Sequence, residues 1–193
     1  MELTSICAAF GLSAAAGLNA WLPLFAGALL NRLDVVELAQ PFDDLTGTGT
    51  LAVLGLLTTV DFVGDKIPAV DHVLHAVGTV VAPVSGALLF TGQSGVESDF
   101  PTIAAVFLGG ATAESIHAGR AVIRPLSTAT TGGVANPVLS LLEDAGALIL
   151  TVLAFAVPVL AFLLVVALAF AILYGWQRVR KRRASGELRR VPP

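Results

Sequence analysis

Two acidic residues four positions apart, Asp61 and Asp65, follow an apolar run in the segment VDFVGDKIP at residues 60–68. In a helix this spacing places both carboxylates on one face. Two carboxylates that share a face can bind a cation or share a proton. The alternative is that Asp65 ends a helix at the membrane surface and pairs with Lys66 or with an arginine.

A carboxylate and an imidazole, Glu114 and His117, have the Glu-x-x-His spacing that metal sites use in helical bundles. The spacing alone does not define a metal, because a site would need more ligands. The candidates for these are His75, Asp61 and Asp65. Alternatively, Glu114 pairs with Arg120 or with a base on another helix.

A third pair of acids, Glu143 and Asp144, lies in an apolar stretch that follows the turn signal Gly132-Gly133. Asn136 can cap a helix there, since the next residue, a proline, suits a first helical turn. Ionised acids inside a membrane helix need a cavity or a base. We therefore expect Arg120 and Arg124 to pair chiefly with Glu114, Glu143 or Asp144. We also expect Asp61 and Asp65 to line one polar cavity with Glu143 and Asp144.

Polar and proline residues interrupt some of the apolar runs that surround these acids. Asn19 and Pro23 stand in GLNAWLP at residues 17–23, and Pro83 lies inside another run. A proline frees a backbone carbonyl inside a helix. In many transporters such breaks mark the substrate site, although a simple packing kink is the alternative.

The composition predicts an all-α membrane protein of about six transmembrane helices. The chain has 55% hydrophobic and 13% charged residues and a mean hydropathy of +0.84. A soluble domain carries about 25% charged residues, and a membrane helix needs about 20 apolar residues. The predicted spans are residues 3–30, 50–63, 73–91, 101–123, 137–156 and 158–176. Residues 1–177 would form one helical domain, and 178–193 a disordered basic tail.

The distribution of basic residues predicts the orientation. Of the 11 basic residues, seven follow Gln177: Arg178, Arg180, Lys181, Arg182, Arg183, Arg189 and Arg190. The connections after the second and fourth predicted spans are basic, whereas those after the first and third are acidic. By the positive-inside rule, both termini would be cytoplasmic. The tail is then a membrane anchor rather than a nucleic-acid site, and the first span is a retained helix rather than a cleaved signal.

An internal similarity relates residues 75–87 to residues 117–129. His, Ala, Val, Pro, Ser and Ala recur at the same spacing, beginning at His75 and at His117. Small transporters are often built from repeated units, so this match predicts two three-helix repeats. It is short and rich in alanine, and chance is the alternative.

Three ordered motifs, at residues 17–24 (GLNAWLPL), 61–71 (DFVGDKIPAVD) and 132–144 (GGVANPVLSLLED), resemble a family of small bacterial membrane proteins. That family is catalogued as a domain of unknown function. The resemblance covers about residues 5–160 and implies a multi-pass protein of the bacterial inner membrane, but it implies no activity. Family members often have Glu where Asp61 stands and Arg where Ala82 stands.

A more distant likeness concerns Gly64-Asp65-Lys66. It is similar to the Glu-x-Gly-Asp-Lys/Arg-Ser/Thr motif of small cation/proton exchangers with two three-helix repeats. Here Asp61 would replace the Glu, with one extra residue before Gly64, and Ile67 replaces the hydroxyl residue.

The expected function is a small secondary transporter that exchanges a cation or small solute, using carboxylates inside the membrane. The sequence has no nucleophile–base pair, zinc signature or phosphate loop, so we expect neither an enzyme nor a cofactor. Expected partners are lipid, a cation or solute and a second copy in a homodimer, but no nucleic acid. A non-transporting scaffold and a lipid-binding or lipid-translocating protein are the alternatives. The candidate binding residues are Asn19, Asp61, Asp65, Glu114, His117, Arg120, Arg124, Asn136, Glu143 and Asp144.

Overall fold

The computed structural model describes residues 2–40, 42–94 and 101–184, and within these ranges every regular element is a helix. The expected all-helical class is thus confirmed. The elements are α1 (Glu2–Leu18), α2 (Leu22–Arg32), α3 (Phe42–Leu45), α4 (Thr48–Gly64), α5 (Pro68–Ser94), α6 (Thr102–Thr131), α7 (Asn136–Ala156) and α8 (Pro158–Ala184).

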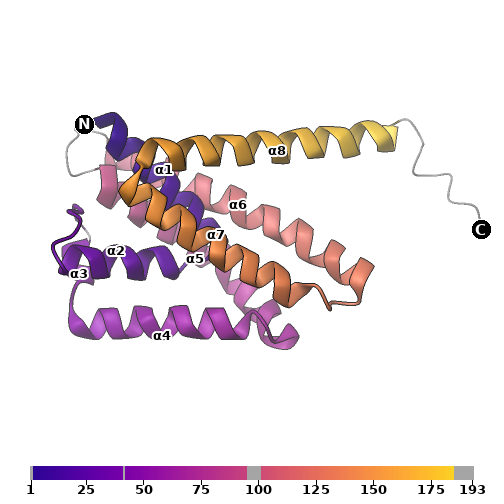
Figure 1. Cartoon of the computed structure of the whole chain (residues 1–193), viewed down its shortest axis with the longest axis horizontal. Coiled ribbons are helices and arrows are strands. Elements are labelled where there is room, and N and C mark those ends of the chain that lie inside the picture. Colours follow the sequence, from indigo (N-terminus) through magenta and orange to yellow (C-terminus); the bar gives the residue numbers. More distant parts are fainter. Residues whose placement is uncertain (1, 41, 95–100, 185–193) are drawn as a thin grey trace, which may run out of the picture.

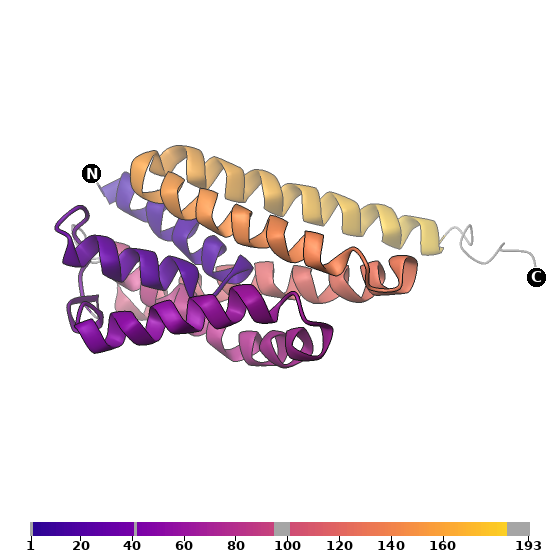
Figure 2. The same ribbon diagram turned by 60° about the horizontal axis from the view of Figure 1, so that its bottom comes forward.

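The predicted single first span is wrong, because the chain reverses direction after α1 (Figures 1 and 2). Phe10 of α1 packs against Phe90, and Gly27 of α2 lies against Leu89, so the middle parts of both helices pass the same part of α5. Asn19 makes the reversal, because its side-chain Oδ1 accepts hydrogen bonds from the backbone N–H groups of Trp21, directly before α2, and Leu22, its first residue. α1 and α2 therefore form a hairpin whose tip lies inside the bundle.

α1 is the central helix of the bundle and packs on α5, α6, α7 and α8. Its buried side chains are mostly alanines, which allow close approach of neighbouring backbones. The contact between α5 and α6 is equally close at Gly86 and Gly109, where a Cβ on either residue would clash with the carbonyl of the other. Small residues thus set the close helix contacts, and large side chains such as Leu12, Phe42 and Phe90 fill the interior between them.

The five predicted spans after the first correspond to α4 through α8, with changed ends. α5 continues through Pro83, and α6 continues past position 125 to Thr131, so these prolines do not break their helices. α6 ends at Gly132 and Gly133, whose φ angles of 64° and 87° suit glycine. The predicted turn at these glycines and the tight connection between α7 and α8 are both confirmed.

The start of α1 and the end of α8 lie at opposite ends of the molecule (Figure 1). This arrangement differs from the expectation of both termini on one side of a membrane. The reason is the hairpin, which returns the chain to its starting end before α4 begins. α8 also extends to Ala184, so the first part of the basic segment is helical, and residues 185–193 lie outside the described residues.

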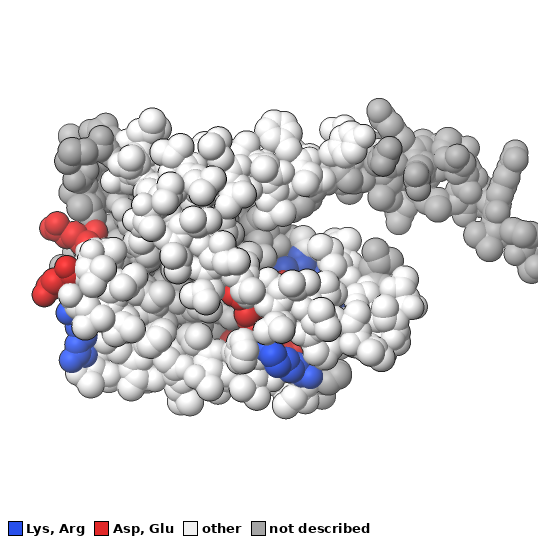
Figure 3. All heavy atoms as spheres, viewed as in Figure 1, with Lys and Arg blue, Asp and Glu red and all other residues white. Residues whose placement is uncertain are grey.

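The outer surface of the bundle is apolar. Residues 70–93 of α5 and all of α7 are long and apolar enough to cross a membrane. Ile103, Phe107 and Val122 of α6 are 86%, 72% and 71% exposed. In Figure 3, charged atoms on the visible face gather at one end and in one inner patch, and the remaining described surface is uncharged. Such continuous apolar exposure is typical of a surface that contacts lipid or another protein.

Candidate functional site

A buried cluster of ion pairs connects α4, α5, α6 and α7. Arg124 of α6 contacts the carboxylates of Asp65, at the end of α4, Asp71, in the first turn of α5, and Glu143 of α7; its distance to Asp65 is 2.9 Å. The side chains of Arg124 and Asp65 are 7% and 4% exposed. Arg120 lies one turn earlier on the same face of α6 and pairs with Asp65 at 3.2 Å and Glu143 at 3.0 Å. The expected pairing of both arginines with Glu143 is confirmed.

The tip of the α1–α2 hairpin is tied to this cluster through Asp144. Asn19 donates a hydrogen bond from Nδ2 to Asp144 Oδ1 at 3.0 Å, and Lys66 pairs with Asp144 Oδ2 at 3.3 Å. Of the two adjacent acids that were expected as alternative partners of the arginines, Glu143 is therefore the one that pairs with them, and Asp144 pairs with Lys66. Asp144 follows Glu143 directly, so it points about 100° away around α7, toward Lys66 instead of the arginines.

Glu114 does not join the cluster. In the described ranges it makes no ion pair, and its buried Oε2 has no hydrogen-bond partner. The alternative pairing with Arg120 is not formed, because residues six apart lie about 120° apart around a helix. The Glu-x-x-His metal hypothesis gains no support either, since no group of three His, Cys, Asp or Glu residues that could hold a metal occurs in the part of the chain that the structure describes.

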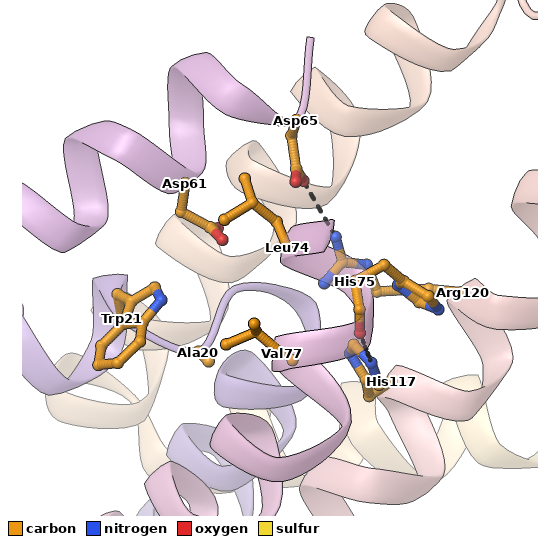
Figure 4. A pocket seen from close by; sticks show the side chains of 10 residues that line it. Ala20, Trp21, Asp61, Asp65, Leu74, His75, Val77, His117 and Arg120 are labelled. Carbon is orange, nitrogen blue, oxygen red and sulfur yellow. Dashed lines mark hydrogen bonds and ion pairs between the residues drawn. The ribbon is translucent and has the colours of Figure 1, made fainter. Parts of the chain in front are cut away.

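Asp61 faces a small cavity of about 20 Å³ beside the cluster (Figure 4). That volume is enough for about one water molecule. The cavity lies between the hairpin tip, with Trp21, and the polar side chains of Asp65, His75, His117 and Arg120. Asp61 makes no ion pair within the described residues. Asp61 and Asp65 thus share a cavity as expected, but Glu143 and Asp144 do not line it.

The two histidines that begin the internal repeat lie face to face. The rings of His75 and His117 stack with centroids 4.5 Å apart and planes at 22°. His117 Nε2 is 3.2 Å from the backbone oxygen of His75, and the Nδ1 atoms of both rings are buried without a hydrogen-bond partner. The internal similarity places the two histidines at equivalent positions in the sequence but does not predict that they touch. Their contact follows from the antiparallel packing of α5 and α6.

A wider cavity of about 380 Å³ lies on the other side of His75. It is lined by Asp71, His72, His75, Ala121, Arg124, Thr128, Ala129 and Asn136. Asn136 does not cap α7 with its side chain; its Nδ2 donates to Thr128 Oγ1 at 2.9 Å, and Ala135 holds the cap position. Asn136 is therefore a residue of this second cavity and is remote from Asn19.

Three residues of the site, Lys66, Asp71 and His75, were not among the candidate binding residues, although Lys66 was considered as a partner of Asp65 and His75 as a metal ligand. Each carries a signal that is visible in the sequence. Lys66 and Asp71 flank the proline that separates α4 from α5, and His75 begins the first copy of the repeat. Their roles depend on how α5 folds back beside α4 and α6, which local spacing does not specify.

The fold and the site together define an all-helical protein that has, in its described ranges, two helices long and apolar enough to cross a membrane and a buried cluster of acids and bases. Within that class, the chain belongs to the family described as "Domain of unknown function (DUF4126)", whose model matches residues 6–178. The family resemblance carried by the three motifs is confirmed. No curated protein and no solved structure matches the chain significantly. The likeness to cation/proton exchangers stays a prediction.

Proposed function

We propose that this protein is a small secondary transporter of the bacterial inner membrane that exchanges a cation or small solute, with Asp61 at its centre. The observation that carries the proposal is a half-buried acidic side chain without an ion-pair partner, within the described residues, on a small polar cavity beside the ion-pair cluster. In and beside the cluster, carboxylates outnumber cations. The carboxylates are Asp61, Asp65, Asp71, Glu143 and Asp144, and the cations are Lys66, Arg120 and Arg124.

An excess of negative charge at membrane depth requires compensation. Inserting one charged residue costs about 2.5–3.5 kcal/mol on experimental scales. Arg120 and Arg124 already contact three carboxylates, so they leave Asp61 for a mobile cation or a proton. A cation or proton bound at Asp61 would therefore compensate the charge that the arginines leave uncompensated.

The two alternative functions fit this arrangement less well. A lipid head group would need free basic side chains, yet each arginine here already contacts at least two carboxylates. A scaffold accounts for the closed network of Arg120, Arg124, Asp65 and Glu143 but not for Asp61. The scaffold function is the one that remains if Asp61 proves unnecessary.

The proposed orientation places the end of α8 in the cytoplasm and the start of α1 outside. Lys66 and the basic residues 178–183 of α8 belong to the end of the molecule where α4 ends and α8 ends, whereas Asp34, Glu37 and Asp44 belong to the other end. The positive-inside rule assigns the basic end to the cytoplasm. α4 to α8 would then cross the membrane, and the α1–α2 hairpin would enter it from outside and return.

The test is self-exchange of radiolabelled Na⁺ or K⁺ in liposomes that contain the purified protein. We expect exchange above that of protein-free vesicles, and we expect Asp61→Asn to reduce it at least tenfold. Asp34→Asn is the matched control, because Asp34 is exposed in the loop after α2 and asparagine tolerates its φ of 55°. Equal exchange by Asp61→Asn and the wild type would exclude Asp61 as the centre and leave the scaffold function.

A further inference from the structure

One side chain is common to both cavities of the site. The small cavity is lined by Asp61, His75 and His117, and the wide cavity is lined by His75. His75 thus lines both cavities from α5, and His117 stacks on it from α6 (Figure 4). The stacked rings therefore offer a route by which a proton can pass between the cavities.

Both imidazoles have a free position for a proton. His117 Nε2 lies at hydrogen-bond distance from the backbone oxygen of His75, so in the neutral ring Nε2 carries the hydrogen and Nδ1 is the acceptor. The Nδ1 atoms of both rings are buried and unpartnered. An unpartnered buried acceptor is costly to keep, which indicates a function that uses it.

Asp61 is half-buried, and the exposed side chains beside it on α4 are apolar. Its neighbours on α4, Val60, Phe62 and Val63, are 45%, 41% and 52% exposed and apolar. In the orientation proposed above these side chains contact lipid. The cavity beside Asp61 has room for about one water molecule, which can bridge a carboxylate and an imidazole.

We infer that His75 and His117 form a proton relay that connects the wide cavity to Asp61, so that the coupling ion of the proposed transporter is the proton. A proton from the wide cavity binds a free ring nitrogen of His75 and makes an imidazolium. The proton then passes directly or through His117 and water to the Asp61 carboxylate, which becomes a neutral carboxyl while the ring returns to neutral imidazole. The role of the relay in coupling rests on the proposed transport function. The transfer of a proton from the wide cavity to Asp61 does not depend on it.

Charged side chains of both signs surround the relay. Arg120, Glu143, Asp65 and His72 act on His75, and His75, Arg120 and Glu143 act on His117. Asp65, Arg120, Asp144 and Arg124 act on Asp61. An imidazolium formed on either ring therefore has carboxylates nearby.

The test follows protonation of Asp61 directly and needs no transport. The protein in lipid nanodiscs is exposed to a rapid acid jump, and time-resolved infrared spectra record the protonated carboxyl band that Asp61→Asn removes. We expect His75→Gln and His117→Gln each to lower the rate at which this band appears at least tenfold. His72→Gln, at a residue that lines only the wide cavity, is the control and should leave the rate within twofold.

A second variant keeps the test decisive if the histidine variants do not fold. Ala129→Cys places a thiol in the wide cavity, in a Cys7→Ser background that removes the only native cysteine. A bulky thiol reagent attached at Ala129→Cys should lower the rate at which the band appears at least tenfold, and its removal should restore the rate. The same reagent at exposed Val134→Cys should not change the rate. An unchanged rate in the histidine or blocked variants, or no Asp61 band in the wild type, would overturn the relay. Cation self-exchange would then still decide the proposed function separately.

Discussion

Asn19, at the tip of the α1–α2 hairpin, donates a hydrogen bond to Asp144 in the middle of the chain's second half, with 3.0 Å between Nδ2 and Oδ1. The same side chain accepts hydrogen bonds from the backbone N–H groups of Trp21 and Leu22. One buried amide therefore both reverses the chain and attaches the hairpin to the charged cluster. Its two functions can be separated by mutation.

We expect Asn19→Ala to destabilise the protein by about 1–3 kcal/mol, because it leaves two backbone N–H groups at the start of α2 without their acceptor and Asp144 with one partner fewer. Asn19→Ser keeps an oxygen that can accept from these N–H groups but loses the amide donor to Asp144, so its loss should be smaller. Thermal unfolding in detergent measures both. Equal losses for the two variants would mean that these two backbone hydrogen bonds contribute nothing.

The buried arginine of the cluster gives the second prediction. Arg124→Leu would leave Asp65, Asp71 and Glu143 without their shared cation, and removing one partner of a buried ion pair costs about 3–5 kcal/mol. We expect Arg32→Leu to cost less than about 1 kcal/mol, since Arg32 is exposed and bonds only to Thr46 and Thr48. Denaturant unfolding measures both free energies.

A double variant tests the origin of that loss. Asp71→Asn removes one of the carboxylates that Arg124 compensates. In the Arg124→Leu background this neutralisation should restore part of the stability, whereas alone it should destabilise. Additive effects would show that Asp71 and Arg124 do not interact energetically.

The pattern of these contacts shows which parts of the site were predictable. α4 to α8 were predicted because each is an apolar run bounded by Gly, Pro or charged residues. The hairpin was not, because hydropathy has no direction: residues 3–30 suit one long helix or two short antiparallel ones equally well. The reversal depends on Asn19 meeting Asp144, which is distant in sequence.

The partners of the arginines show the same limit. Burial of Arg120 and Arg124 required acids nearby, and this was correctly predicted. Which acids they are depends on the rotation of each helix. Adjacent Glu143 and Asp144 point to different partners, and Glu114 faces away from Arg120 on the same helix.

The third prediction concerns the close contact of α5 and α6. A Cβ at Gly109 would lie 2.6 Å from Phe90 Cβ and would also meet the Gly86 carbonyl, so Gly109→Ala must push the helices apart. We expect a loss of about 1–3 kcal/mol. Gly119→Ala on the same helix has open space around its Cβ and should be neutral or stabilising by up to about 1 kcal/mol. Equal stability of the two variants would contradict the close packing.

The last prediction tests the orientation through three single cysteines in a Cys7→Ser background. Leu3 at the start of α1, Asp34 after α2 and Val134 after α6 are all exposed. Because the hairpin brings the start of α1 and the end of α2 to one end of the molecule, Leu3→Cys and Asp34→Cys should both react with a membrane-impermeant maleimide added to intact spheroplasts. Val134→Cys should react only after the membrane is opened. A single first span would instead protect Leu3→Cys while leaving Asp34→Cys reactive, so the pair distinguishes a re-entrant hairpin from one crossing helix whatever the protein transports.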